Sequence, residues 1–203
     1  MTGLTAGPGP GVELQARRRL ARVPIDQPPG LLSRALAWYA RKMYGQMPDN
    51  GWAMAANRKV LFATLGFERK VEKFDALPEQ LRSLAEMAVA TEIGCTWCVD
   101  FGYFLAHRKG LDLDKLRAVA DWRDADVFSE LERQVIAFAV AATATPSEVT
   151  DELSEPLRAA LGDAGLVELA MMVAVENQRS RFNAALGLVS QGFSAVCQLP
   201  SSR

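Results

Sequence analysis

The chain has 203 residues and a formal charge of −1, from 23 basic and 24 acidic side chains. This balance argues against a general nucleic-acid binder, which would carry a surplus of basic residues. Hydrophobic residues make up 49% of the sequence and charged residues 23%, which is ordinary globular usage and excludes wholesale disorder. Three cysteines and one histidine are too few for a disulfide-stapled scaffold, and this low count is compatible with a reducing cytoplasm.

The N-terminus lacks the basic head and apolar stretch of a secretory signal, and no apolar run approaches the about 18 residues that a membrane span needs. The longest such run, 135–147, fits a core helix better. We therefore expect a cytoplasmic protein with neither a membrane nor a nucleic acid as its partner. Glycines and prolines fill residues 1–13 and recur up to Gly30. Residues 1–30 are expected to form a flexible tail and connector, and residues 31–203 a single domain.

From residue 31 onward, apolar residues recur at helical spacing between recognisable start and stop signals. The first predicted helices cover 31–45, about 54–67, 78–94, 95–108 and a short segment capped by Asp112 or Asp114. Capping boxes at Ser129 and at Thr145-Pro146-Ser147-Glu148 predict two further starts. Gly162 ends the second of these segments, and Asp163 begins a last long helix. No segment shows sustained strand alternation, so the sequence predicts an all-α bundle of about seven to nine helices.

Cys95 and Cys98 form a Cys-x-x-Cys pair at the start of the helix expected over 95–108. Three-residue spacing on a first helical turn places both sulfurs on nearby faces, close enough to bridge after small adjustment. The free N–H groups and the dipole of a helix N-terminus stabilise a thiolate and lower its pKa from about 8.5. A thiolate attacks peroxides and disulfides, and the second cysteine then closes an internal disulfide. The pair therefore indicates redox chemistry.

Other interpretations of the pair stay open. A thioredoxin-like fold needs strands around the motif, and none is expected here. The two cysteines could simply be small apolar residues packed in a bundle. They could also join Cys197 and His107 in a zinc site, which requires the C-terminal segment to fold back onto the motif. Nothing in the spacing demands that, so we expect neither a metal nor a cofactor. Cys197 is then either a packed thiol or a third redox partner.

The stretch LRSLAEMAVATEIGCTWCVDFGYFLAHRKGLDLDKL resembles the core of the carboxymuconolactone decarboxylase-like superfamily, and more narrowly its alkylhydroperoxidase AhpD-like branch with Cys-x-x-Cys. The resemblance extends over residues 45–198. It implies an all-α fold that self-associates as a homo-oligomer. It also implies thiol peroxidase or disulfide reductase activity, with a peroxide or disulfide as substrate and a dithiol or partner redox protein as reductant. The implied cycle has Cys98 as the attacking thiolate and Cys95 as the resolving, more accessible partner.

The chain departs from the AhpD pattern at two positions that form the family's proton relay. The pattern has a glutamate twelve residues before the first cysteine and a histidine four residues after the second. Here these positions hold Ser83 and Gly102. The departure favours an alternative function, a non-catalytic oligomeric scaffold or small-ligand binder with a degenerate site. A true lactone decarboxylase is a third possibility, but that reaction needs no dithiol.

Four residues near the motif are candidate replacements for the relay: Glu92, Glu86, Asp100 and His107. Glu86 could swing towards the site from the preceding helix, whereas Glu92 fits a solvated last turn. Asp100 fits a partner for the helix dipole. His107 lies half a turn away from Cys98 around the helix and fits a helix end.

Polar residues interrupt the apolar pattern of the last helix: Glu176, Asn177, Arg179, Arg181 and Asn183. Arginine forks pair well with carboxylates in buried surroundings. We therefore expect a buried ionic network at a subunit interface, with a site for an anionic substrate as the alternative.

Overall fold

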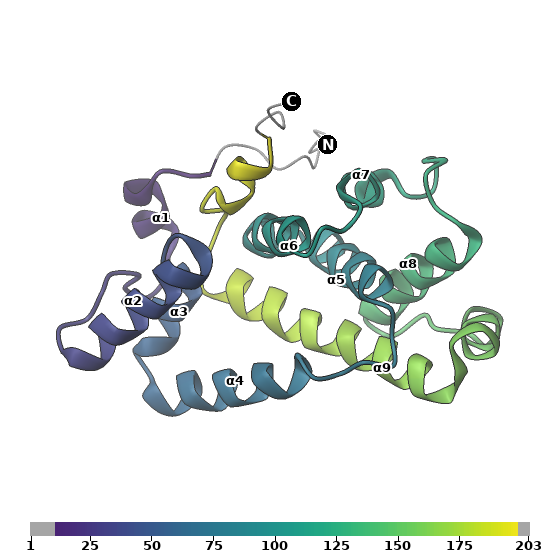
Figure 1. Ribbon diagram of the computed structural model, residues 1–203, viewed down its shortest axis with the longest axis horizontal. Helices are drawn as coiled ribbons and strands as arrows, with labels where there is room; N and C mark the ends of the chain where they lie inside the picture. The colour runs from purple at the N-terminus through teal and green to yellow at the C-terminus, as the bar shows by residue number, and fades with distance from the viewer. Residues whose placement is uncertain (1–10, 199–203) are drawn as a thin grey trace.

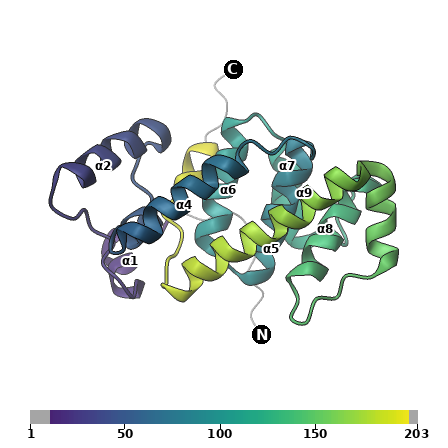
Figure 2. The same cartoon turned by 90° about the horizontal axis from the view of Figure 1, so that it is seen from below.

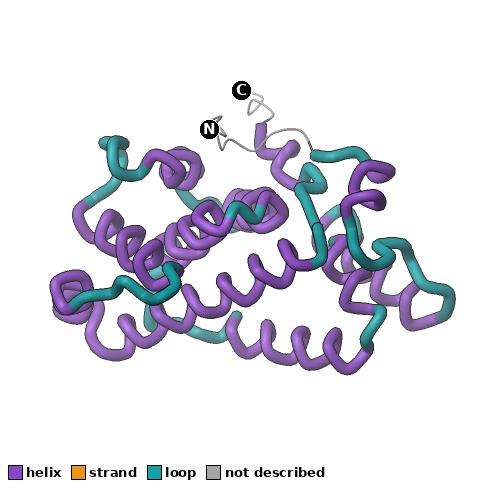
Figure 3. Tube along the Cα trace, turned by 180° about the vertical axis from the view of Figure 1, so that it is seen from behind, coloured by secondary structure: helices purple, strands orange, loops and turns teal. Residues whose placement is uncertain are grey.

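The computed structural model describes residues 11–198, with side chains described up to residue 195. Every regular element in this part of the chain is helical (Figure 3), which confirms the all-α prediction. In chain order the elements are α1 (Leu14–Leu20), α2 (Leu31–Tyr44), α3 (Asp49–Ala55), α4 (Arg58–Val71), α5 (Glu79–Ile93), α6 (Thr96–Arg108), α7 (Leu113–Ala118), η1 (Val119–Asp121), α8 (Glu130–Thr143), α9 (Asp151–Ala185) and η2 (Phe193–Gln198).

The main core forms where α5, α8 and α9 pack against one another, with α6 on a further side of α5 (Figure 1). Leu81, Leu84, Ala85 and Ala88 of α5 share the spacing of one helical face, and all four are buried. Full burial of a leucine such as Leu84 contributes about 1.5–3 kcal/mol. Helix α4 lies along the outer side of α9 (Figures 1 and 2). An ion pair between Arg179 and Glu68 joins α9 to α4, while the opposite face of α9 packs on the core.

Several helix ends follow local signals that the sequence shows. Gly94 adopts a left-handed conformation with φ 75° and ends α5, as expected from its lack of a Cβ. Asp112 accepts two backbone N–H bonds at the start of α7. Ser129 and Glu132 form the capping box at the start of α8. These three boundaries are confirmed.

The single helix expected over about 54–67 is wrong, because this segment holds the end of α3 and most of α4. Asn57 separates the two helices. Its side-chain oxygen accepts hydrogen bonds from the backbone N–H groups of Lys59 and Val60, at 3.1 and 3.3 Å. Asn57 is thus an N-cap for α4, which the apolar pattern alone does not reveal.

The helix start expected at Thr145–Glu148 is also wrong. The backbone N–H of Glu148 donates to the carbonyl of Ala141 at 2.9 Å, so this segment turns back onto α8. Helix α9 begins only at Asp151. Gly162 interrupts it with φ 71° and ψ 173°, so the expected break before Asp163 is confirmed.

The flexible segment expected over 1–30 needs a correction for its described part. Helix α1 forms there, and the backbone N–H of Val12 donates to the carbonyl of Ser190 at 3.0 Å. Arg17 pairs with the buried carboxylate of Asp49 at 2.7 Å. Residues 1–10 lie outside the described residues. The domain boundary at residue 31 stays a prediction.

None of the described helices combines the length and the apolar character that crossing a membrane demands.

Candidate redox site

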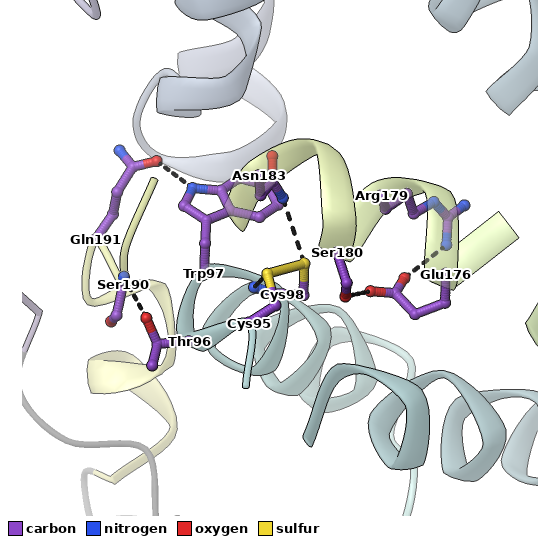
Figure 4. Close-up of a disulfide and its surroundings, with 10 residues drawn as sticks. All are labelled: Cys95, Thr96, Trp97, Cys98, Glu176, Arg179, Ser180, Asn183, Ser190 and Gln191. Carbon is purple, nitrogen blue, oxygen red and sulfur yellow. Dashed lines mark hydrogen bonds and ion pairs between the residues drawn. A yellow bond between two sulfur atoms is a disulfide. The ribbon is translucent and has the colours of Figure 1, made fainter. Parts of the chain in front are cut away.

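The two cysteines of the motif lie where α5 ends and α6 begins. Cys95 is the N-cap of α6, and its Sγ accepts a hydrogen bond from the backbone N–H of Cys98 at 3.2 Å. The two sulfurs are joined as a disulfide, with the Cα atoms 5.3 Å apart (Figure 4). The expected position of the pair at a helix start is confirmed.

Both sulfurs are buried beneath aromatic and aliphatic side chains. Cys98 is 7% exposed and Cys95 is 3% exposed. The expectation that Cys95 is the more accessible of the two is therefore wrong within one chain. The second apolar cluster that encloses them includes Trp52, Trp97, Phe104, Leu188 and Phe193. A reactant must be small, or must displace some of these side chains, to reach the pair.

Trp97, between the two cysteines, is held in place by a hydrogen bond across the cluster. Its Nε1–H donates to Oε1 of Gln191 at 2.9 Å. The same oxygen accepts the backbone N–H of Asp49 at 2.7 Å. Phe101 stacks on Trp97 with ring centroids 5.0 Å apart. The segment after α9 is thereby tied to one side of the disulfide (Figure 4).

A polar face of α9 lies on the other side of the disulfide. Nδ2 of Asn183 donates to Sγ of Cys98 at 3.3 Å. One turn earlier, Oγ of Ser180 donates to Oε1 of Glu176 at 2.8 Å. Glu176, Ser180 and Asn183 are 5%, 0% and 1% exposed, so the whole row is buried. Oδ1 of Asn183 is buried without a hydrogen-bond partner among the described residues.

Arg179, which lies beside this row, forms ion pairs with three carboxylates. Its guanidinium lies 2.5 Å from Glu68 of α4, 2.8 Å from Glu86 of α5 and 3.3 Å from Glu176. The ionic network expected at a subunit interface thus joins three helices of one chain. Burial raises the pKa of Glu176 to about 8, against the opposing effect of the Arg179 charge.

Asp100, one of the candidate relay residues, binds a different part of the chain. It is 2% exposed and accepts six hydrogen bonds from the segment 190–194. The donors are the backbone N–H groups of Gln191, Gly192, Phe193 and Ser194 and the hydroxyls of Ser190 and Ser194. This geometry favours a clamp for the segment after α9 over a proton relay.

The other three candidates are placed apart from the sulfurs or are already paired. Glu86 forms its ion pair with Arg179. Glu92 and His107 are exposed, at the ends of α5 and α6. Their relay roles stay predictions without a supporting contact. The sequence analysis did not single out Ser180, although it lies one turn from both Glu176 and Asn183 on an otherwise apolar helix.

The two positions at which the chain departs from the AhpD pattern, Ser83 and Gly102, are closely surrounded by other side chains. Ser83 is buried at 8% exposure. A Cβ placed on Gly102 would meet Sδ of Met87 at 3.1 Å. A larger side chain at this position therefore requires Met87 to move.

The zinc interpretation depends on Cys197, whose side chain lies outside the described residues. Among the side chains that the structure does describe, no three histidine, cysteine or acidic groups gather closely enough to hold a metal ion.

Comparison with known proteins gives both a family and a fold. Residues 59–141 match the model of the carboxymuconolactone decarboxylase family. The uncharacterized protein YnjA of Escherichia coli K12 is 33% identical over 184 residues, which cover 89% of this chain and 97% of YnjA.

Solved structures share the fold at lower identity. The debrominase Bmp8, in complex with 2,3,4-tribromopyrrole, has a TM-score of 0.73 at 19% identity and covers 87% of this chain and 96% of its own. An uncharacterized peroxidase-related protein from Ralstonia eutropha JMP134, described as an alkylhydroperoxidase AhpD core, has a TM-score of 0.70 at 19% identity. The match covers 86% of this chain and 95% of that protein. At these identities the likeness is one of fold.

Proposed function

Since this chain belongs to the carboxymuconolactone decarboxylase family, we propose that it is a thiol-dependent hydroperoxide reductase or disulfide oxidoreductase. The observation that carries the proposal is the disulfide between Cys95 and Cys98 at the start of α6. A pair that bridges within one helical turn can open and close without rearranging the fold. The peroxidase-related neighbour with the same fold supports the choice of substrate.

The cycle begins with attack by the Cys98 thiolate on the terminal oxygen of a hydroperoxide. The O–O bond breaks, the alkoxide leaves and takes up a proton, and Cys98 becomes a sulfenic acid. The thiol of Cys95 then attacks this sulfur, the S–S bond forms, and the hydroxyl leaves with the thiol proton as water. In total the dithiol gives two electrons, and the products are an alcohol, water and the disulfide. An external dithiol restores the pair by thiol–disulfide exchange.

The surroundings of both sulfurs suit an anionic intermediate. The Asn183 amide that donates to Cys98 would donate more strongly to a thiolate, because hydrogen bonds to charged acceptors are stronger than those to neutral ones. Cys95 receives the N–H of Cys98 at the positive end of α6. Each sulfur therefore has one donor that favours its thiolate form.

The family resemblance extends the proposal to the partners and the place of action. We propose a homo-oligomer in the cytoplasm, which uses a small dithiol or a redox protein as its reductant. Large exposed apolar side chains support self-association, including Leu31 (82% exposed) and Trp38 (65% exposed) on α2.

Turnover of cumene hydroperoxide with dithiothreitol as the reductant tests the proposal. We expect Cys98→Ser to lose turnover about 100-fold or more, because the nucleophile is gone. Without dithiothreitol, Cys95→Ser should react once with the hydroperoxide and keep a sulfenic acid on Cys98 that a dimedone probe traps. Cys197→Ser serves as the matched control and should keep the wild-type rate. If Cys98→Ser and the wild type are indistinguishable and neither exceeds the uncatalysed rate, the result favours the alternative, a non-catalytic scaffold or ligand binder, which the departures at Ser83 and Gly102 suggest.

A further inference from the structure

We propose that Ser180 and Glu176 on α9 donate a proton to the alkoxide that leaves when Cys98 attacks a hydroperoxide, in place of the family relay that is missing at Ser83 and Gly102. This inference rests on the proposed redox cycle and adds the source of the proton that the departing alkoxide needs. The row approaches the sulfur from a different helix than the relay positions, which lie on α5 and α6.

The contact between Asn183 and Cys98 sets the orientation of the row. Because Nδ2 of Asn183 reaches Sγ of Cys98 at 3.3 Å, this face of α9 is turned towards the sulfur. Ser180 lies three residues earlier on the same face, where side chains are direct neighbours. Figure 4 shows the side chain of Ser180 between the disulfide and the carboxyl group of Glu176. The three residues thus line up along one edge of the redox pair.

The hydrogen bond between Ser180 and Glu176 is the path along which the proton moves from the carboxyl group to the hydroxyl group. Oγ of Ser180 and Oε1 of Glu176 are 2.8 Å apart. A hydroxyl group both donates and accepts, so it can receive a proton from a protonated carboxyl group and pass its own proton onward. Ser180 is 0% exposed and Glu176 5% exposed. Bulk water therefore does not compete for this route in the described geometry.

Glu176 holds a proton at neutral pH because of its surroundings. Its pKa is raised to about 8, mainly by burial and also by the nearby Glu86 carboxylate, whereas Arg179 and the hydrogen bond from Ser180 lower it. The guanidinium is nearer to Glu68 on α4 and to Glu86 on α5 than to Glu176. The charge of Arg179 is thus shared with two other carboxylates, which leaves Glu176 as the neutral member of the cluster.

Beside this row on α9, the charged Arg181 donates hydrogen bonds to Oδ1 of Asn177 and to the carbonyl of Thr143. From α8, the hydroxyl of Thr143 accepts a hydrogen bond from Asn177 at 3.0 Å. From α6, Sγ of Cys98 accepts the hydrogen bond from Asn183. Of the charged groups nearby, Arg179 and Glu86 act on the pKa of Glu176, and Glu68 pairs with Arg179.

The proton balance of the step is complete. As the Cys98 thiolate takes the terminal oxygen of the hydroperoxide, the hydroxyl proton of Ser180 goes to the leaving alkoxide, and the carboxyl proton of Glu176 replaces it. Glu176 is left as a carboxylate. When the external dithiol regenerates the thiol of Cys98, formation of the next thiolate releases one proton, which restores Glu176.

The test is the rate of a single turnover, in which the fully reduced chain is mixed with cumene hydroperoxide between about pH 6 and pH 9. A positioned general acid contributes about 100-fold or more, so we expect Ser180→Ala and Glu176→Gln to slow oxidation by at least about tenfold. The wild-type rate should fall at alkaline pH as Glu176 loses its proton. This alkaline fall should disappear in Glu176→Gln.

Glu155→Gln is the matched control, because Glu155 is an exposed carboxylate on α9 itself that pairs with neither Arg179 nor Ser180 among the described contacts. It should keep the wild-type rate within about twofold and retain the alkaline fall. Wild-type rates and pH profiles in both Ser180→Ala and Glu176→Gln would overturn the inference and leave the redox cycle standing. If the wild-type chain itself does not consume peroxide, the proposed function fails first. Should Glu176→Gln fail to fold, Ser180→Ala alone decides, since it leaves the carboxyl cluster intact.

Discussion

A single buried carboxylate, Asp100, ties the segment after α9 to the helix that carries the cysteines. Six donors from residues 190–194 converge on its two oxygens. The same segment supplies Gln191, which holds the indole of Trp97. Asp100 therefore positions one wall of the redox site without touching the sulfurs.

Replacement of Asp100 by asparagine should destabilise the fold. The asparagine side chain would carry one neutral oxygen and one NH₂ group, and the NH₂ would face N–H donors. We expect a loss of about 2–4 kcal/mol in the free energy of unfolding in urea. Asp114→Asn is the matched control, because its ion pair with Arg117 is exposed, and we expect a change within about 0.5 kcal/mol. Equal stability of the two variants would contradict the clamp.

The sequence predicts the role of a residue when its partners are close in the chain, and fails when they are far away in the chain. Cys95 and Cys98 were identified because their chemistry depends on a local spacing of three residues. For Asp100 the sequence suggests a dipole partner or a relay residue, because the donors that bind it lie 90 or more residues away and leave no local pattern. Ser180 was missed for the same reason: a serine in a helix carries no sign that a sulfur from another helix lies beside it.

Helix boundaries are predicted correctly where nearby side chains determine them, and incorrectly where another helix determines them. The starts at Asp112 and Ser129 depend on side chains within three residues, and the sequence predicts them. The false start at Thr145 has an equally good local pattern. It fails because the N–H of Glu148 is already bonded to Ala141 on the preceding helix. A capping box therefore predicts a helix only where no neighbouring element competes for its backbone groups.

Two glycines in helical segments should respond oppositely to replacement by alanine. Gly162 has φ 71°, a conformation that a Cβ disfavours, so Gly162→Ala should cost about 1 kcal/mol. Gly66 lies inside α4 with open space around it, so Gly66→Ala should stabilise the chain by up to about 1 kcal/mol. Urea unfolding of both variants measures the difference. Stabilisation by Gly162→Ala would contradict the break in α9.

The molecule as a whole leaves several large apolar side chains on its surface. They lie on α2, on α4 and on the outer side of α9, and they include Trp38 (65% exposed), Phe62 (49%), Val167 (68%) and Met171 (43%). These side chains lie on three different helices, and large exposed apolar groups often mark surfaces through which protein molecules associate. This surface fits the self-association that the family resemblance implies.

Light scattering at several concentrations tests self-association directly. We expect a molar mass of at least twice the 22.1 kDa of one chain, because association would cover the exposed side chains of α2, α4 and α9. A mass of one chain at every concentration would contradict the expectation. It would leave the intrachain contacts of the redox site unchanged.

The redox cycle itself is the central claim, and a count of thiols tests it most directly. The reduced, denatured chain should show three thiols, one for each cysteine. After one equivalent of hydroperoxide on the native protein, the count should fall to one. Mass spectrometry should then find a single linkage between Cys95 and Cys98, with one alcohol formed per chain. Three thiols remaining after peroxide treatment would contradict the account.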